Sequence, residues 1–325
     1  MRKIYTLLLL VALQSMALAE DFEWTSVTFD NDLFTGSDNG YTNGLTISLY
    51  DISEEEALEA SWMTSPFLGI MSDKASLATL DIYTVGQIMQ TPGDITLPVP
   101  PQGDVPYAGL LYVANNYIKV YENYSEDFTT TVGIVGPASG AKRTQRLVHS
   151  LFGADEPMGW SFQLKNEPVF KLNYGRTYRA WKYQDETSDV LFRYEAGLGN
   201  LESSIQTSLL YRYGHNLQTS YPTAGFNSSR LSNPTATNGD WYFYFGLMGR
   251  YTFNTIFLDG NTFEDDSPSV DYERFNLGFI GGIAYSWQNI SLTFSFTDQD
   301  ILNEEVDGDF EQYNRYGSIT VAWKL

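Results

Sequence analysis

Hydrophobic and polar residues alternate along most of this chain with the two-residue period of a β-strand. Segments that alternate in this way, or are rich in aromatic residues, cover 22–32, 42–52, 77–90, 107–122, 126–136, 168–184, 189–199, 203–215, 240–254, 272–286, 290–299 and 312–325. In the last segment Ile319, Val321 and Trp323 share one face, and Thr320, Ala322 and Lys324 share the other. An even number of strands is what a closed antiparallel barrel needs if both chain ends lie on one side of a membrane.

The composition also favours a membrane barrel. Aromatic residues make up 15% of the chain, with 23 Tyr, 20 Phe and 7 Trp. Beyond residue 20, no stretch approaches the roughly 20 apolar residues of a transmembrane helix. We therefore predict an all-β fold, a transmembrane antiparallel β-barrel of about 12 strands formed by residues 20–325. A secreted soluble β-sandwich or lectin-like domain is the alternative that the pattern alone leaves open.

The first residues have the three-part pattern of a secretory signal peptide. Arg2 and Lys3 precede an apolar run at 7–13, and small residues lead up to Ala19. We expect residues 1–19 to direct export, since this apolar run is too short to span a bilayer. The formal net charge of −21 argues against a nucleic-acid partner, whose phosphates require Lys and Arg. The chain has no cysteine, which excludes disulfides and thiolate metal sites.

The alternation of strand direction assigns each connection to one side of the membrane. If the N-terminus is periplasmic, the loops near 33–41, 91–106 and 137–167 are extracellular. The connections near 53–76 and 216–238 are then periplasmic, and both are longer than the usual turn. We expect the first of these two to contain a short helix of its own.

A short amphipathic helix is predicted in the third extracellular loop, at 141–152. Its apolar positions are Leu147, Val148, Leu151 and Phe152. Gln145 and His149 lie one turn apart on an adjoining stripe. The other histidine, His215, is expected near the opposite rim, so only His149 can meet the polar pair Asn31 and Asp32. A surface helix with a solvated His and Gln is the alternative interpretation.

The end of the first strand offers oxygen ligands for a metal ion. Asn31 and Asp32 precede a glycine-containing loop, after which Thr42 begins the second strand. Adjacent carboxylate and amide oxygens suit calcium better than zinc or copper. Ordinary turns use the same residue types, so the pattern alone leaves both interpretations open.

Two further features surround His149. Lys142, Arg143 and Arg146 form a local cationic cluster, which could hold an anionic lipid head group or simply be a solvated face. Asp155 follows His149 by six residues, close enough for its carboxylate to fix the tautomer of a histidine base. Direct attack by water is the simpler mechanism, with Ser139 and Ser150 as alternative nucleophiles.

Several ordered motifs resemble the lipid A 3'-O-deacylase family of bacterial outer membranes. They are FDNDLFTGSDNGYTNGL at 29–45, QIMQTP at 87–92, DVPYAGLLY at 104–112, VGPASGAKRTQRLVHSLFGADEPMGWSFQLKNE at 135–167 and YGHNL at 213–217. The resemblance covers almost the whole mature length. It implies a twelve-stranded barrel in the Gram-negative outer membrane, with an active site between the barrel wall and a helix in an extracellular loop.

The resemblance also implies a reaction and its residues. The family's essential positions fall on Asn31, Asp32, Thr42, Gln145 and His149. They imply calcium-dependent carboxylic ester hydrolysis, in which His149 deprotonates water and calcium near Asp32 binds the substrate carbonyl and acts as the oxyanion hole. The expected partner is lipid A, the membrane part of lipopolysaccharide, and the expected state is a monomer.

Two residues and one loop of this chain depart from the family pattern. Asp155 stands where Glu is found, and Val105 replaces an arginine common beside the PYAG motif. The 91–106 loop also lacks a substrate-contacting lysine. These departures favour one alternative, a binding or structural barrel without catalysis. A second alternative is an outer-membrane phospholipase with the same machinery.

Overall fold

The computed structural model describes residues 22–31, 40–54, 58–101, 103–152, 155–224, 241–298, 301 and 315–325. Residues 1–19, predicted as a signal peptide, and Asp32 lie outside these ranges, as does the side chain of Thr42. Within the described ranges, no helix is both long enough and apolar enough to cross a membrane.

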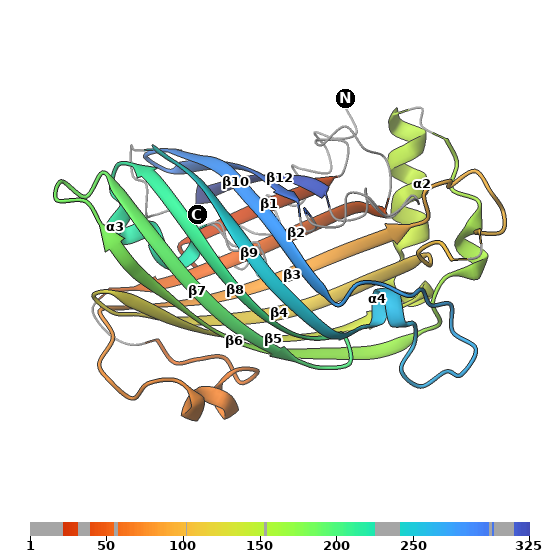
Figure 1. Cartoon of the computed structure of the whole chain (residues 1–325), viewed down its shortest axis with the longest axis horizontal. Coiled ribbons are helices and arrows are strands. Elements are labelled where there is room, and N and C mark those ends of the chain that lie inside the picture. Colours follow the sequence, from red (N-terminus) through yellow and green to blue (C-terminus); the bar gives the residue numbers. More distant parts are fainter. Residues whose placement is uncertain are drawn as a thin grey trace.

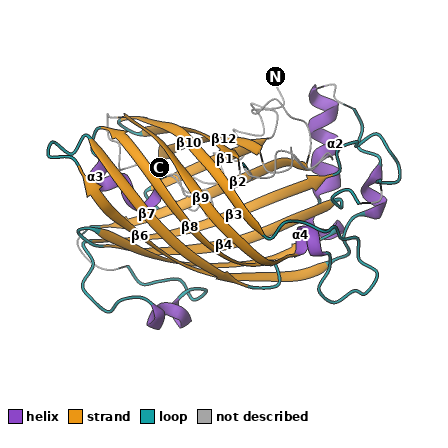
Figure 2. Cartoon of the chain, in the orientation of Figure 1, coloured by secondary structure: helices purple, strands orange, loops and turns teal. Residues whose placement is uncertain are grey.

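The strands form one closed barrel (Figures 1 and 2). They are β1 (Trp24–Asn31), β2 (Gly40–Ser53), β3 (Ala78–Thr91), β4 (Ala108–Val120), β5 (Tyr124–Val135), β6 (Glu167–Lys182), β7 (Ser188–Leu198), β8 (Glu202–Gly214), β9 (Trp241–Thr255), β10 (Phe275–Trp287), β11 (Ile290–Asp298) and β12 (Arg315–Lys324). Each strand pairs antiparallel with its sequence neighbours, and β12 closes the ring on β1. The predicted barrel is confirmed, and every strand ends within about three residues of its predicted bounds.

Short helices occupy the connections. They are η2 (Ser65–Ile70), η3 (Pro137–Ser139), α2 (Ala141–Phe152), η4 (Gly159–Phe162), α3 (Leu217–Ser220), η5 (Tyr221–Thr223) and α4 (Ile256–Asp259). The helix predicted at 141–152 is therefore present as α2, and the 53–76 connection contains the 3-10 helix η2. Figure 1 shows α2 and α4 at one end of the barrel and α3 at the other.

The connections differ in length between the two ends. At the α2 end 92–107, 136–166 and 256–274 are long. At the other end 121–123, 183–187 and 288–289 are short turns, and 54–77 and 215–240 are the long exceptions. Long extracellular loops and short periplasmic turns are typical of bacterial membrane barrels. The α2 end is therefore extracellular. His215 lies against Trp241 at the opposite end, as predicted, with ring centroids 5.7 Å apart.

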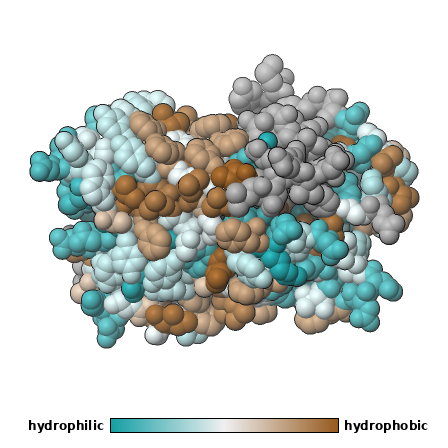
Figure 3. All heavy atoms as spheres, viewed as in Figure 1, coloured by the Kyte–Doolittle hydropathy of each residue, from teal (hydrophilic) through white to brown (hydrophobic). Residues whose placement is uncertain are grey.

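The two faces of the wall have different chemistry. Outward positions such as Val85, Val113 and Leu247 are exposed and apolar, and Figure 3 shows apolar residues gathered mainly over the middle of the barrel. The lumen instead holds buried ion pairs. Arg193 binds Asp127 at 2.5 Å, and Arg212 binds Asp189 at 2.7 Å. Because partners lie on different strands, these pairs cross-link the barrel from inside.

Candidate active site on the outer face of the wall

The segment that leads into α2 lies outside the barrel. Val85 on β3 is exposed, which identifies the outward face of that strand. Gln87 lies two residues further along and therefore shares this face. Its Nε2–H donates to the carbonyl oxygen of Ser139 in η3 at 2.6 Å. The bond holds η3, and the start of α2 after it, against the outer surface of the wall.

Gly109 gives α2 its seat on β4. A Cβ atom built on Gly109 would collide with the Ala141 Cβ and the Ser139 Oγ. Only glycine allows so close an approach of helix and strand. Beside it, Met89, Tyr107, Ala141 and Trp160 form a buried apolar cluster. The PYAG motif therefore shapes the contact between the wall and the helix, a role that its sequence did not reveal.

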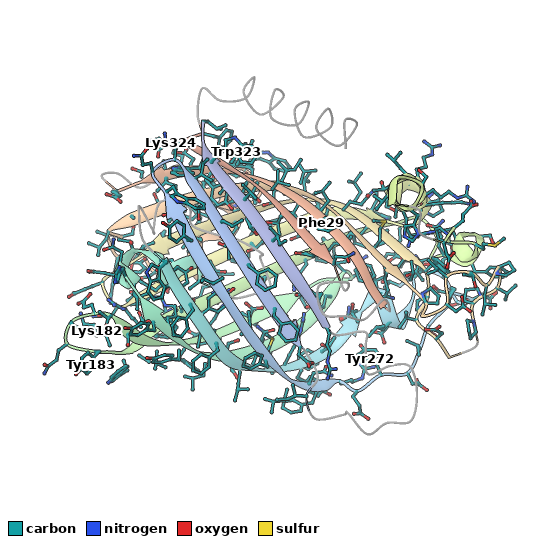
Figure 4. All side chains as sticks on the ribbon, turned by 90° about the horizontal axis from the view of Figure 1, so that it is seen from above. Phe29, Lys182, Tyr183, Tyr272, Trp323 and Lys324 are labelled. Atoms are coloured by element: carbon teal, nitrogen blue, oxygen red, sulfur yellow. The ribbon has the colours of Figure 1, made fainter. Side chains whose placement is uncertain are left out.

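Asn31 lies on the same outward face at the same rim. It follows Phe29, which is exposed and is labelled on β1 in Figure 4, while Asn31 itself is only 7% exposed. The strand register places side by side Asp30, Gly44, Ile88 and Leu110 of β1 to β4. With strands about 4.8 Å apart, the end of β1 lies roughly 10 Å from β3. Asn31 therefore approaches the wall that supports α2.

Thr42 lies at an irregularity in the sheet. The register between β2 and β3 shifts between Tyr41 and Asn43, so Thr42 occupies the break. Bulges of this kind are frequent at barrel rims and beside active sites, because they redirect a side chain. Asp32, which the sequence assigns to the metal, lies outside the described residues. In the described part of the chain, no cluster of three or more His, Asp or Glu side chains is arranged to hold a metal ion.

Gln145 is buried and its amide is oriented by Trp160. The Nε1–H of Trp160 donates to Oε1 of Gln145 at 2.6 Å. Because an indole only donates, the accepting atom must be the amide oxygen, which leaves Nε2 as the remaining donor. Among the described residues this Nε2 has no hydrogen-bond partner, although Gln145 is only 1% exposed. A buried N–H donor without a partner in the protein is available to donate a hydrogen bond to a ligand.

Trp160 is a site residue that the sequence reasoning missed. It comes from η4, eleven residues beyond His149, and its ring lies 5.0 Å from that of Tyr107. Burial raises the pKa of Tyr107 to about 12, so this phenol stays neutral at physiological pH. Trp160 could have been recognised from the sequence by its position inside the 135–167 motif.

His149 is bonded to Asp155, but through the main chain. Its Nδ1 lies 2.5 Å from the carbonyl oxygen of Asp155. A carbonyl oxygen can only accept, so Nδ1 carries the proton and Nε2 of the neutral ring has a free lone pair. The sequence reasoning assigned this orienting role to the carboxylate. In the structure the contact with His149 is made by the main-chain carbonyl, so the shorter arm of Asp compared with Glu does not limit it.

The outer side of α2 combines cations with an apolar residue. Arg143 is exposed, Lys142 is half-buried, and Arg146 pairs with Glu156 at 3.0 Å. Leu147, one of the apolar positions of the predicted helix, is 55% exposed. The helix instead buries Ala141 and Gln145, because the close seat on Gly109 accepts only a small side chain.

The loop that carries α2 is fastened to the β9–β10 loop. The main-chain N–H of Lys165 donates to Asn261 Oδ1 at 2.9 Å, and Asn261 Nδ2 donates back to the Lys165 carbonyl at 3.0 Å. The carboxylate of Glu167 accepts from the N–H of Thr262 at 2.9 Å. These bonds restrain the extracellular loops around the candidate site.

The role of the Asp155 side chain can be tested directly. Asp155→Ala keeps the main-chain carbonyl that binds His149, so any ester hydrolysis should stay within about tenfold of wild type. The measurement is the rate of fatty acid release by the folded variant. A loss as large as that caused by removing His149 itself would show that the carboxylate is required.

The orientation of Gln145 should depend on Trp160. Trp160→Phe keeps an aromatic ring against Tyr107 but removes one hydrogen bond, typically worth about 1 kcal/mol, or about fivefold in rate. We expect kcat to fall and KM to change little. Trp241→Phe at the opposite end is the matched control and should leave both unchanged. Equal kinetics in the two variants would contradict the positioning role.

Comparison with known proteins assigns the family. The family model described as "Outer membrane protein LpxR" matches residues 4–325. The structure of LpxR from Salmonella typhimurium matches with a TM-score of 0.71 at 14% identity, covering 93% of this chain and 100% of that one, which shows a shared fold. The β-domain of the Bordetella autotransporter BrkA has a TM-score of 0.44 at 10% identity, covering 93% and 98%. A search of curated proteins finds no match. Because the family model spans nearly the whole chain, this protein belongs to the LpxR family of outer-membrane β-barrels.

Proposed function

We propose that this protein is an outer-membrane hydrolase that removes the 3'-linked acyl chains of lipid A. Family membership supports a lipid A deacylase. The observation that carries the finer proposal is the bond between His149 Nδ1 and the Asp155 carbonyl, on a helix seated against the outer wall. Lipid A lies in the outer leaflet, so its ester bonds can reach this interface laterally from the membrane.

His149 acts as the general base in the proposed reaction. Its Nε2 removes a proton from water while the water oxygen forms a bond to the ester carbonyl carbon. When the tetrahedral intermediate collapses, the bond to the sugar oxygen breaks and the imidazolium returns the proton to that oxygen. The products are a free fatty acid and a sugar hydroxyl. The Asp155 carbonyl keeps the ring in the tautomer that the first step needs.

Gln145 and Trp160 position the reacting groups. The free Nε2–H of Gln145 is a donor held in a buried site, where it can bind water or an ester oxygen. Thr42, at the bulge of β2, is proposed to assist in the same positioning. Because Trp160 fixes the Gln145 amide before substrate arrives, little reorganisation is needed during the reaction.

The residues at the end of β1 fit a calcium ion. Asn31 and Asp32 would hold it, since amide and carboxylate oxygens are the hard ligands that calcium prefers. The buried position of Asn31 on the outward face of the rim is consistent with this role. When bound there, calcium would supply positive charge to the oxygen that becomes negative during ester hydrolysis.

The cations of α2 are proposed to bind the phosphates of lipid A. Lys142 and Arg143 have no carboxylate partner among the ion pairs of the described residues, whereas Arg146 shares its charge with Glu156. A monomer suffices for this arrangement, because the helix and the wall come from one chain.

The direct test is mass spectrometry of lipid A after incubation with the detergent-folded protein, with calcium and with a chelator. We expect loss of the 3'-linked acyl chains with calcium and intact lipid A with chelator. Parallel incubation with glycerophospholipids separates the alternatives. Release from phospholipid alone would indicate a phospholipase, and no release from either lipid by a heat-modifiable, folded barrel would indicate a non-catalytic one.

A further inference from the structure

The connection between β2 and β3 folds back along the outside of the barrel. We name residues 58–77 the cover segment, and Figure 1 shows it in orange against the barrel near the end opposite α2. Its apolar residues pack on Tyr117 and Phe128, with Leu172 and Tyr174 at the edge. Tyr117 shares the outward face of β4 with the exposed Val113. The cover segment therefore lies where lipid contacts the rest of the wall.

The wall beneath the cover segment is polar. On the outward face, Asp81, Asn115 and Glu126 are all buried, and Asn115 Nδ2 donates to Asp81 Oδ1 at 2.5 Å. Charged groups on the lipid face of a membrane barrel are unfavourable, increasingly so with depth. These three residues break the apolar pattern of the outer wall at a place that protein covers.

The cover segment supplies hydrogen bonds to this polar wall. The N–H of Ser72 donates to Glu126 Oε2 at 2.7 Å, and Tyr117 Oη donates to the Leu58 carbonyl at 2.6 Å. Between these ends, Phe67 stacks on Phe128 with ring centroids 5.1 Å apart. The contacts fix which side of the cover segment faces the barrel and which side faces away.

The exposed residues of the cover segment include large apolar side chains as well as the charged Glu59, Asp73 and Lys74. Trp62 is 83% exposed and Ile70 is 61% exposed. Along β6, the exposed aromatic Trp181 lies near the periplasmic end, next to Lys182 and Tyr183, which Figure 4 labels. The cover segment contacts Leu172 and Tyr174 of the same strand, nearer the extracellular end. Since exposed aromatics mark the membrane boundary, the cover segment lies on its membrane side.

We propose that the cover segment is a lipid-binding surface, in which Trp62 and Ile70 insert among the phospholipids of the periplasmic leaflet. Exposed Trp62 and Ile70 continue the lipid-facing belt of the barrel, and Trp is the residue best suited to the boundary between acyl chains and head groups. The segment thus covers a polar part of the wall and presents Trp62 and Ile70 to the lipid. The inference is independent of the proposed hydrolysis.

The absence of cysteine in the chain makes a direct test possible. Single cysteines replace Trp62 or Ile70, and a nitroxide is attached to each in vesicles of phosphatidylethanolamine and phosphatidylglycerol. Spectroscopy then compares collisions with oxygen, which concentrates in acyl chains, and with a water-soluble nickel chelate. Val113→Cys on the lipid-facing wall and Asp185→Cys in the exposed β6–β7 turn are the two reference positions.

We expect labels at positions 62 and 70 to match position 113, with high oxygen and low nickel accessibility. Nickel accessibility like that of position 185 would place the surface in water and overturn the proposal. Shielding from both reagents that disappears on dilution with lipid would indicate a second copy of the chain and would also overturn it.

A second measurement avoids labels. Quenching of tryptophan fluorescence by phospholipids brominated on their acyl chains should be weaker in Trp62→Phe than in wild type, because one lipid-exposed indole is lost. Phe keeps the apolar character, so the barrel should fold equally well. Equal quenching in both proteins would contradict lipid insertion.

Discussion

His149→Ala is expected to lower lipid A deacylation by about 10²–10⁴-fold, the usual contribution of a general base. The half-buried ring makes its contact in a loop outside the barrel, so its removal should leave the barrel folded. The measurement is the initial rate of fatty acid release, with heat-modifiable migration on gels as evidence of folding. A rate close to wild type would rule out the proposed base.

The chain contains a matched control for this variant. His215 is its only other histidine, and it lies against Trp241 at the opposite end of the barrel. His215→Ala should retain the wild-type rate. His149→Asn adds a sharper comparison, since its amide N–H can replace the bond to the Asp155 carbonyl but supplies no base. It should be as inactive as alanine if proton removal, and not loop geometry, is what His149 provides.

The bounds of the strands could be predicted closely because each strand has lipid on one face and a polar lumen on the other. Lipid outside requires apolar residues such as Val85 and Val113, and a polar lumen accepts residues such as Asp127 and Arg193. Residues on opposite faces must therefore alternate along each strand. The helix 141–152 was equally visible, because its start follows Gly140 and its periodicity changes from two to 3.6 residues.

The cover segment could not be predicted from this pattern. Asp81 and Asn115 occupy outward positions that the alternation assigns to lipid, and nothing nearby in sequence shows that residues 58–77 lie over them. Their neighbours are protein atoms contributed by a distant part of the chain. The sequence did predict a short helix in this connection, but not the surface on which it rests.

For the candidate site, the sequence predicted which residue types take part better than it predicted the contacts between them. Sequence patterns describe side chains, so the contact with His149 was assigned to the Asp155 carboxylate, whereas the structure makes it through the main-chain carbonyl. Similarly, the apolar positions of the predicted helix did not show which side of α2 packs on the wall, since Leu147 is exposed whereas Ala141 and Gln145 are buried. Asp32, central to the calcium proposal, stays a prediction.

Gly109→Val is expected to lower deacylation by about 10²-fold, although it changes no catalytic group. The new side chain would occupy the space of Ala141 Cβ and Ser139 Oγ, so α2 must move away from the wall. A shift of about 1 Å in a positioned catalytic group can cost this much in rate. His149 and Gln145 both move with the helix, whereas Asn31 stays with β1.

Gly249→Ala is the control for a strand glycine without such a contact, because the nearest atom to its added Cβ would be 3.9 Å away. It should retain both folding and rate. The added methyl of Gly109→Ala already reaches Ala141, so this variant should fall between Gly109→Val and wild type, and pairing it with Ala141→Gly should restore part of the loss. Wild-type rates in both Gly109 variants would mean that the reaction does not depend on where α2 sits. The graded loss with partial rescue, in a barrel that still folds, would instead identify the space between wall and helix as the place where the ester is cleaved.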